Sequence, residues 1–425
     1  MNGRGFKKSE WEEVGDPIIR IQNLNDRSAS FNRTTRAFED RYRVRDGDLL
    51  FAWAATLGAY IWRGGNAWLN QHIFKVVPEP FIMSKYLYYA FLHLVPFLYS
   101  QTHGSGMVHI TKKRFEAIRL GVPPLVEQRA IVAKIEELFS ELDKGIEQLQ
   151  TAKQQLNQYR QAVLKAAFEG KLTAEWRAEQ QAAGNLPDAD ELLEQIKKER
   201  EERYQQQLQE WKRAVVEWEE AGGRDSGRKK PRKPTAPRRP PVLAEDERAN
   251  LPPLPEEWVW VRFGALASEM CLGKMLDQKR NKGVLMPYLR NINVRWYDFD
   301  LSDVSQMRFE PGEEERYGLK NGDLVICEGG EPGRAAIWNS PVPSMMIQKA
   351  LHRVRLPALY SGRFALHFLQ YSSLNGHMES YFTGTTIKHL TGKGLERVPF
   401  PLCPVEEQMR IADELDCRLS VLDEL

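Results

Sequence analysis

An internal duplication constrains the fold of this chain more than any other feature. The segment from Arg41 to Trp62, RYRVRDGDLLFAWAATLGAYIW, returns between Arg316 and Trp338 as RYGLKNGDLVICEGGEPGRAAIW. A later segment, His109 to Ile135, returns in the same order between His389 and Leu415. The period is far longer than that of the repeats that stack into solenoids, so it predicts two copies of one domain. Two similar domains with different loops suit one task performed at two places with two specificities.

The composition fits a protein of two or three domains without an overall polycationic character. The chain has 425 residues, and 60 Lys+Arg against 58 Asp+Glu give a formal net charge of +2. Any nucleic-acid surface must therefore be local. The four cysteines show neither CxxC nor Cys/His spacing, which argues against a zinc module and a disulfide framework. This cysteine usage favours a reducing, cytoplasmic location.

The sequence contains neither an evident membrane segment nor a recognisable catalytic motif. The apolar run Phe81 to Leu98 is interrupted by Lys85, His93 and Pro96, which indicates a buried helix rather than a membrane span. The start of the chain does not read as a signal peptide. Phosphate-loop, HExxH, GxGxxG and amino-methyltransferase motifs are missing from the sequence. We therefore predict a binding subunit without catalytic activity of its own.

The first copy occupies residues 1–123 and reads as an α+β domain. Short apolar or alternating runs broken by Gly and Asp predict strands. One helical stretch, Met83 to Tyr99, follows them. The runs are Pro17–Leu24, Asp48–Ala54, Ala59–Trp62 and Ile73–Val77.

A long spacer helix is predicted within residues 124–185. Apolar residues recur every seven positions over about five heptads, and Gly170 is placed as a C-cap. At 1.5 Å per residue, the segment from Pro124 to Phe168 would span roughly 65 Å. An ordinary amphipathic helix packed on its own domain is the alternative. The stripe comprises Ile135, Leu142, Leu149, Leu156 and Val163, with Ile131, Leu138, Gly145, Ala152, Tyr159 and Ala166 at the interleaved position.

The rest of the chain reads as a charged segment, the second copy and a final helix. Residues 186–250 combine a highly charged, solvent-exposed helix with a Pro- and Lys/Arg-rich linker. The linker is either a solvated tether or a source of phosphate contacts between Arg228 and Arg239. Residues 251–403 form the second domain. Residues 404–425 form a distal helix that repeats the start of the spacer helix.

Candidate DNA-binding residues lie in the segments before the repeated helices. Gly384 to Leu390 combines Gly, Thr, Lys and His, and its counterpart is Gly104 to Ile110. Glycine permits close approach to a surface, and hydroxyls, Lys and His can contact phosphates or base edges. The alternative is a structural turn with packed histidines. The candidates are Ser105, His109, Lys112 and Lys113 in the first copy and Thr385, Thr386, Lys388, His389 and Lys393 in the second.

Two repeated Arg/Asn pairs add further candidates. Arg20 and Asn23 match Arg290 and Asn293. Arg suits guanine and Asn suits adenine in the major groove. Residues three apart on a strand lie on opposite faces, so at most one of each pair is expected to face a ligand. The other is then a structural hydrogen-bonding residue.

The loop that follows the repeated GD turn differs between the copies. It reads AATLG at 54–58 and GGEPG at 329–333. Specificity is usually written in loops that diverge on a shared scaffold. We therefore expect these two loops to differ in what they recognise.

Three segments together resemble the specificity subunits of type I restriction-modification systems. GTTIKHLTGKGLERVPFPLCPVEEQMRI is similar to the end of a target-recognition domain. VPPLVEQRAIVAKIEELFSELDKGI with LNQYRQAVLKAAFEGKLTAEWR is similar to the central spacer helix. LPPLPEEWVWVRFGALASE is similar to the start of a second recognition domain. The resemblance covers most of the chain and implies an α+β fold, with two target-recognition domains joined by a long coiled-coil spacer helix and a shorter antiparallel distal helix.

The same resemblance implies partners and cofactors. Each domain would bind one half of a bipartite site in double-stranded DNA. Modification subunits would methylate adenine with S-adenosylmethionine, and restriction subunits would use ATP and Mg²⁺ for translocation and cleavage. The chain itself would need no cofactor. The competing hypothesis is a coiled-coil adaptor with two protein- or RNA-binding domains.

Both ends of the chain depart from the family pattern. Many more residues separate Trp258 from Pro287 in the second copy than precede Pro17 in the first. The distal helix also stops where its counterpart would be at Gly145. We therefore expect a first domain without its initial strand and a shortened distal helix.

Overall fold

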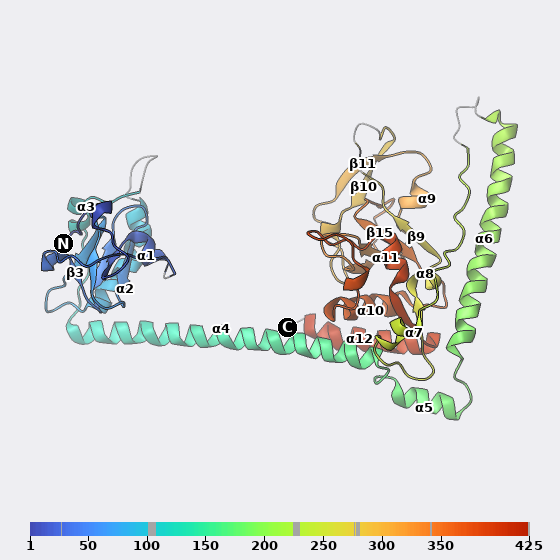
Figure 1. Cartoon of the computed structure of the whole chain (residues 1–425), viewed down its shortest axis with the longest axis horizontal. Helices are drawn as coiled ribbons and strands as arrows, with labels where there is room; N and C mark the ends of the chain where they lie inside the picture. The colour runs from blue at the N-terminus through green and yellow to red at the C-terminus, as the bar shows by residue number, and fades with distance from the viewer. Residues whose placement is uncertain are drawn as a thin grey trace. The chain divides into compact units, whose positions relative to one another are not determined.

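The chain comprises two compact units, Met1–Thr151 and Ala152–Leu425, which are described separately below. Helix α4 (Leu125–Phe168) begins in the first unit and ends in the second (Figure 1). The computed structural model describes residues 1–26, 28–100, 108–223, 230–275, 277, 281–340 and 342–423.

The first unit contains two small sheets with a helix against the second. One sheet has the strand order β2-β1-β6-β3 and the other β5-β4-β7. Strand β1 is parallel to β6, whereas β4 is antiparallel to both of its neighbours. The strands are β1 (Asp16–Ile19), β2 (Asn32–Thr34), β3 (Arg43–Val44), β4 (Leu49–Ala52), β5 (Gly58–Ile61), β6 (Ala67–Leu69) and β7 (Ile73–Val76). The helices are η1 (Lys8–Glu10), α1 (Ile21–Asn25), η2 (Asp40–Tyr42), α2 (Ser84–Ser100) and α3 (Lys112–Glu116).

Most of the predicted strands are present, but the run from Pro17 to Leu24 is not one strand. Strand β1 ends at Ile19 and the chain turns into α1 at Ile21. The turn is fixed by Asn23, whose side-chain oxygen accepts a hydrogen bond from the backbone N–H of Arg20 at 3.1 Å. Alternation along a strand therefore does not apply to the Arg20 and Asn23 pair, since Asn23 lies on a helical turn.

The second unit rebuilds the same two sheets. Strand β10 is antiparallel to β11 and parallel to β14, as β1 is to β2 and β6. Strand β12 pairs with β13 and β15 as β4 pairs with β5 and β7. This shared topology confirms the predicted duplication and the α+β class. The strands are β8 (Val259–Arg262), β9 (Glu269–Leu272), β10 (Val284–Leu289), β11 (Ser305–Phe309), β12 (Leu324–Cys327), β13 (Ala335–Ile337), β14 (Met346–Ile347), β15 (Leu351–Arg355) and β16 (Pro399–Leu402).

Helices surround these sheets in the second unit. Strand β9 extends one sheet and β16 pairs with β8 as a separate ribbon. The helices are α5 (Ala174–Ala182), α6 (Ala189–Glu220), α7 (Glu245–Ala249), α8 (Phe263–Leu266), η4 (Asn291–Asn293), α9 (Glu314–Tyr317), α10 (Gly362–Leu374), η5 (Glu379–Tyr381), α11 (Gly392–Arg397) and α12 (Val405–Asp423).

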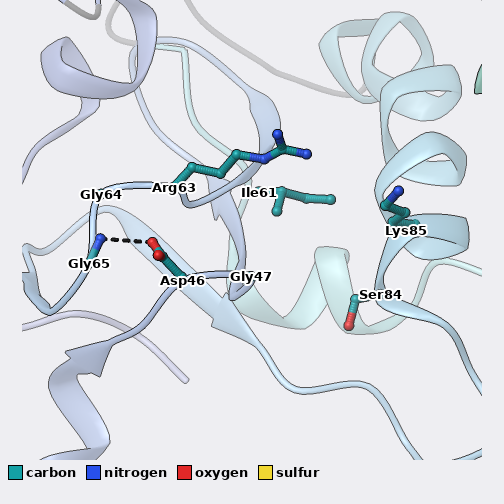
Figure 2. A pocket seen from close by; sticks show the side chains of 8 residues that line it. All are labelled: Asp46, Gly47, Ile61, Arg63, Gly64, Gly65, Ser84 and Lys85. Carbon is teal, nitrogen blue, oxygen red and sulfur yellow. Dashed lines mark hydrogen bonds between the residues drawn. The ribbon is translucent and has the colours of Figure 1, made fainter.

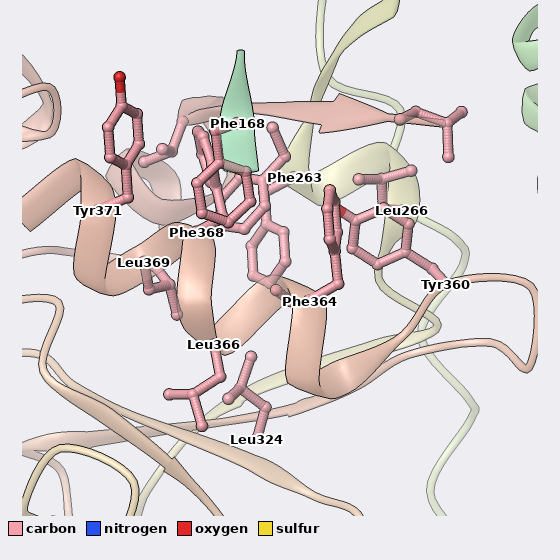
Figure 3. Close-up of a cluster of buried hydrophobic side chains, with 14 of the residues drawn as sticks. Phe168, Phe263, Leu266, Leu324, Tyr360, Phe364, Leu366, Phe368, Leu369 and Tyr371 are labelled. Atoms are coloured by element: carbon pink, nitrogen blue, oxygen red, sulfur yellow. The ribbon is translucent and has the colours of Figure 1, made fainter. Parts of the chain in front are cut away.

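The main core of the second unit is aromatic and centres on α10. Phe364 and Phe368 are fully buried and contact Phe168 at the end of α4, with ring centroids 5.4 and 5.1 Å apart (Figure 3). Phe263 stacks on Phe400 at 4.1 Å. Aromatic side chains bury large apolar areas, so these contacts fix the end of the spacer helix to the second domain.

Helix α4 ends as predicted, and the last helix of the chain, α12, lies beside its end as an antiparallel partner. Gly170 has φ +68°, and the N–H of Lys171 donates to the carbonyl of Ala166, which is the left-handed cap expected there. Helix α12 begins beside the end of α4 and runs back along it, because Glu407 contacts Thr173 whereas Arg418 contacts Tyr159.

The apolar stripe of α4 is buried at the ends of the helix and exposed in its middle. Val163 near the end of the stripe is 5% exposed, and Ile131 and Ile135 at its start are partly buried, whereas Leu142 and Leu149 are 57% and 73% exposed. Each end of the helix thus packs on the domain beside it. The predicted packing of a second helix along the spacer is present where α12 lies beside α4, with Val163 and Leu164 in the same core cluster as Ile411 and Leu415.

Helix α6 and the linker that follows it are more tightly packed than the sequence predicts. Leu192, Ile196 and Arg200 are buried in α6, and the guanidinium of Arg200 donates to the carbonyls of Gly264 and Arg238, each at 3.0 Å. Among the described linker residues, Arg238 pairs with Glu396. Arg238 thus fixes one point of the linker to the second unit, although most of the side chains in residues 230–243 are exposed or only partly buried. Charge on the surface concealed the few apolar positions that anchor α6.

One glutamine anchors each repeated helix to its domain. The Gln128 oxygen accepts from the N–H of Met83 at 2.8 Å, and its amide nitrogen donates to the carbonyls of Phe81 and Pro123 at 2.9 and 2.8 Å. Gln408 repeats the arrangement with the N–H of Ser361 at 2.8 Å and the carbonyl of Cys403 at 2.7 Å. Both side chains are fully buried.

The glutamate before each glutamine has a different environment in the two copies. Glu407 is fully buried and accepts hydrogen bonds from Thr173 at 2.7 Å, Arg177 at 2.5 Å and Trp258 at 2.9 Å. Its counterpart Glu127 is exposed. The carboxylate of Glu407 thus joins the start of α5, the start of α12 and the residue before β8.

We predict that Glu407→Ala lowers the free energy of unfolding by about 3–5 kcal/mol, because it removes the buried acceptor of Thr173 and Trp258 and leaves Arg177 only its longer ion pair with Glu257 at 3.4 Å. Glu127→Ala is the matched control and is expected to change it by less than about 0.5 kcal/mol. Urea unfolding followed by tryptophan fluorescence measures both. Equal effects of the two substitutions would contradict this assignment.

Candidate nucleic-acid interface

Two loops of the second unit meet at the end of strand β12. Residues 328–334 leave β12 and residues 383–389 precede α11. Gly329 forms a β-bridge with His389, and the N–H of Leu390 donates to the carbonyl of Glu328 at 2.7 Å. Segments that lie far apart in the sequence thus form one continuous rim.

The first unit builds the same junction with different residues. Ala54 forms the equivalent bridge with His109, and the N–H of Ala55 donates to the carbonyl of Val108 at 2.8 Å. Ala55 has φ +59° where Gly330 has φ +84°. Both residues thus adopt left-handed backbone conformations, although alanine seldom does so. The backbone turn is therefore the same in both copies while the side chains differ. The divergent loops that the sequence singled out therefore lie beside the predicted histidines in both copies.

A third loop joins this junction in the second unit. The side-chain amide of Asn291 donates to the carbonyl of Gly329 at 3.2 Å, and the guanidinium of Arg334 donates to the carbonyl of Asn291 at 2.9 Å. In the first unit Asn25 donates to the hydroxyl of Thr56 at 3.2 Å. Sequence analysis did not single out Asn291 or Arg334. The available signals were the position of Arg334 directly after the divergent loop and that of Asn291 within the repeated Arg290/Asn293 motif.

Asn23 and Asn293 have a structural role and are not placed to read DNA. Both are almost fully buried, at 4% and 2% exposed. The Asn293 oxygen accepts from the N–H of Arg290 at 2.9 Å, and its nitrogen donates to the carbonyls of Asp300 and Asp303 at 2.9 Å. Asn23 repeats the pattern with the N–H of Arg20 and the carbonyls of Ala29 and Ser30. The hydrogen-bonding capacity of both amides is thus used within the fold, which corrects their assignment as base contacts.

The paired arginines remain partly accessible. Arg290 donates to the carboxylate of Asp303 at 2.7 Å and its side chain is 23% exposed. Arg20 lies over the ring of Trp11 at 5.5 Å. Their contact with DNA stays a prediction.

The remaining candidates are distributed as follows. Thr385, Thr386 and Lys388 are exposed on the rim loop, and Lys393 is exposed on α11. His109, Lys112 and Lys113 are exposed at the same place in the first unit, where Lys112 pairs with Glu116 at 3.4 Å. Ser105 lies outside the described residues. Their contact with DNA likewise stays a prediction.

The histidines differ from one another in their surroundings. The Nδ1 atom of His389 lies 3.0 Å from the carboxylate of Glu328 and is only partly exposed. Beneath it, His352 on β15 is buried and its Nε2 lies 2.7 Å from the carbonyl of Leu390. Burial lowers the pKa of His352, so the neutral ring donates through Nε2–H and supports the rim loop.

A hollow in the first unit lies at the other end of the β4–β5 hairpin. It has a volume of about 520 Å³ and is lined by Asp46, Arg63, Gly65, Ser84 and Lys85 among others (Figure 2). Asp46 accepts from the N–H of Gly65 at 2.7 Å, and Lys85 pairs with Glu136 at 2.6 Å. These groups serve turns and the docking of α4, so we assign no ligand to the hollow.

The described residues contain no group of three or more His, Cys, Asp or Glu side chains placed to hold a metal ion. Within the same part of the chain, every helix falls short of the length or the apolar character that crossing a bilayer requires.

Comparison with known proteins agrees with the architecture described above. Residues 1–152 match the family model of the type I restriction modification DNA specificity domain. The EcoBI specificity subunit of Escherichia coli is 31% identical over 177 residues, which cover 41% of this chain and 37% of that protein. The EcoKI specificity subunit of Escherichia coli strain K12 is 29% identical over 216 residues, covering 47% and 46%.

A solved structure shares the fold across the chain. It comes from work on complex assembly and conformational transition of the type I R-M system, with a TM-score of 0.62, 16% identity and coverage of 100% of this chain and 88% of that one. The family-model match over residues 1–152 and these two relatives confirm the resemblance of the chain to type I specificity subunits. The matched segments span less than half the length of the two curated relatives.

We predict that Asn293→Ala lowers the free energy of unfolding by about 2–3 kcal/mol, because it leaves the backbone N–H of Arg290 and the carbonyl of Asp300 without their partner and removes one of the two donors to the carbonyl of Asp303. Asn250→Ala removes one hydrogen bond at an exposed helix end and is expected to cost about 0.5 kcal/mol. Urea unfolding compares them. A neutral Asn293→Ala would return this residue to the set of candidate DNA contacts.

Proposed function

We propose that this protein is the sequence-specific DNA-binding subunit of a type I restriction-modification complex. Each unit recognises one half of a bipartite site in double-stranded DNA, and α4 sets the separation of the halves. Specificity proteins that use two modules take their half-site spacing from the element that joins the modules. The chain acts by recognition and carries no catalytic centre of its own.

One observation carries this proposal. The same junction of loops is built twice, at Ala54 with His109 and at Gly329 with His389, with a conserved backbone and different side chains. A scaffold kept constant under changing loops is suited to reading two different sequences. A protein- or RNA-binding adaptor gives no comparable reason for a repeated rim that carries Lys, Thr and His.

The partners follow from the proposal. Modification subunits supply adenine methylation from S-adenosylmethionine, and restriction subunits supply ATP- and Mg²⁺-dependent translocation and cleavage. The assembly works on cytoplasmic DNA. The similarity of the chain to type I specificity subunits supports this set of partners.

Single-molecule sequencing of methylated adenine tests the function. We expect a host that carries this gene with its modification gene to show a bipartite motif, and the motif to disappear when this gene alone is deleted. An unchanged methylome would reject the proposal.

Paired substitutions test the assignment of one half-site to each unit. Lys388→Ala is expected to weaken binding about tenfold at one half of the motif, because it removes one contact to DNA. Lys113→Ala is expected to act on the other half only. Binding of the assembled methyltransferase to duplexes with one half replaced measures this. Loss at both halves from either substitution would contradict the division of labour.

A further inference from the structure

A chain of hydrogen bonds crosses the second unit from the distal helix to the recognition loops. The Oδ1 atom of Asp416 on α12 lies 2.8 Å from Nε2 of His367 on α10. The Nδ1 atom of the same imidazole lies 2.9 Å from the hydroxyl of Tyr297, which also lies 2.6 Å from the side-chain oxygen of Gln370. His367 is only 2% exposed, so this polar chain runs through the interior of the unit.

Tyr297 is held in an uncommon conformation. Its φ is +67°, a region that residues other than glycine seldom adopt. The tight turn around it is closed by the N–H of Arg295, which donates to the carbonyl of Asp298 at 2.8 Å. Such a conformation persists only where the surroundings impose it. The hydroxyl bonds to α10 are such surroundings.

The turn that carries Tyr297 is joined to the candidate DNA-binding rim. The N–H of Tyr297 donates to the carbonyl of Ala335 on β13 at 3.2 Å. A few residues before it, Asn291 bonds to Gly329, and Gly329 forms the bridge with His389. A displacement of Tyr297 is therefore passed to the loops that carry Lys388 and Thr385.

At the other end, Asp416 belongs to the helix that runs along the spacer. Burial alone raises the pKa of Asp416, but hydrogen bonds from His367 and Arg363 outweigh it and lower the pKa below its ordinary value. Arg363 holds the second oxygen of this carboxylate at 2.7 Å and also reaches Asp413 at 2.6 Å. Asp416 is thus an ionised anchor on α12.

The donors and acceptors in this chain fix the direction of the hydrogen bond between His367 and Asp416. The carboxylate of Asp416 can only accept, so the Nε2 atom of His367 carries hydrogen. The hydroxyl of Tyr297 has one proton. In one arrangement the hydroxyl donates this proton to the side-chain oxygen of Gln370 and accepts from the Nδ1–H of an imidazolium at His367. In the other, the hydroxyl donates to Nδ1 of a neutral His367 and accepts from the amide nitrogen of Gln370. Every group is satisfied in both arrangements, and removing the hydroxyl disrupts both.

The first unit has an ion pair that corresponds to the one between Arg363 and Asp416, but it lacks the chain of hydrogen bonds that leads from there to a loop. Lys85 and Glu136 occupy the places of Arg363 and Asp416 and pair at 2.6 Å. The place of His367 is taken by Tyr89, which packs on Phe139 with ring centroids 6.2 Å apart. Among the described residues, the first unit has no relay of this kind from helix to loop.

We infer that Tyr297, His367 and Asp416 form a positioning relay that couples the distal spacer helix to the recognition loops of the second unit. These residues do not touch DNA. They set the position of the rim that does, and they do so for one half-site only. The inference rests on the proposed function and adds the residues that align one of its two reading surfaces with the spacer.

The test compares two single-atom deletions in the assembled methyltransferase. Tyr297→Phe removes the relay hydroxyl. Tyr360→Phe is the matched control, because its buried hydroxyl bonds to the carbonyl of Pro401 at 2.9 Å in the same unit but lies outside the relay. Each variant is bound to duplexes carrying the native motif or a motif with one half replaced.

Tyr297→Phe is expected to reduce discrimination about fivefold at the half-site that Lys388→Ala affects, and to leave the other half unchanged. Tyr360→Phe is expected to change neither, although it also removes a hydroxyl that is hydrogen-bonded inside the same unit. Equal behaviour of the two variants while the wild type still methylates its motif would overturn the relay and leave the proposed function standing. A wild type that methylates no motif would reject the proposed function instead.

Three further variants separate positioning from general stability. Glutamine at position 367 can still donate to Asp416 and accept from Tyr297, so His367→Gln is expected to retain most of the discrimination that His367→Leu loses. The effects of Tyr297→Phe and Asp416→Asn on that half-site are expected to be less than additive, because both interrupt one chain. Strict additivity would contradict the coupling, and thermal unfolding of each variant identifies any that fails to fold.

Discussion

A buried glutamine at the first turn of a helix is the contact on which each unit depends. Gln128 and Gln408 use both ends of their amides to hold the backbone that leads into α2 or α10 and the turn that leads into their own helix. The amides are fully buried, so every one of these bonds is needed to offset the loss of water. Because the same contact recurs, each domain meets its helix with the same local geometry.

The two copies then diverge in how firmly that geometry is enforced. In the second unit, the carboxylate of Glu407 is enclosed by Arg177, Thr173 and Trp258, and α10 is buried beneath the aromatic end of α4. In the first unit, the corresponding Glu127 is exposed, and so is the middle of the α4 stripe. A repeat therefore does not make two equivalent domains. The scaffold is duplicated, whereas the supporting shell is specific to each copy.

The sequence predicted what the repeat and helical periodicity dictate. The two domains, the long helix and its end at Gly170 were predicted from pattern. The divergent loops and the segments at His109 and His389 were singled out separately, and their meeting is a finding of the structure. The sequence could not predict which member of the Arg290 and Asn293 pair is buried, because that depends on where β10 ends. The packing of α6 was also missed, since Arg200 finds its carbonyl partners only in the folded unit.

The relay shows why the rest of the site lay beyond sequence reasoning. Tyr297 lies 70 positions from His367, and His367 lies 49 positions from Asp416. No motif links them, and each alone reads as an ordinary surface or core residue. Their conjunction has meaning only because α10 passes between a recognition loop and the distal helix. A domain that binds one half-site needs loops whose side chains can vary, and it must also be held firmly on the spacer helix. A buried chain of hydrogen bonds holds the domain on the helix without limiting which side chains the loops carry.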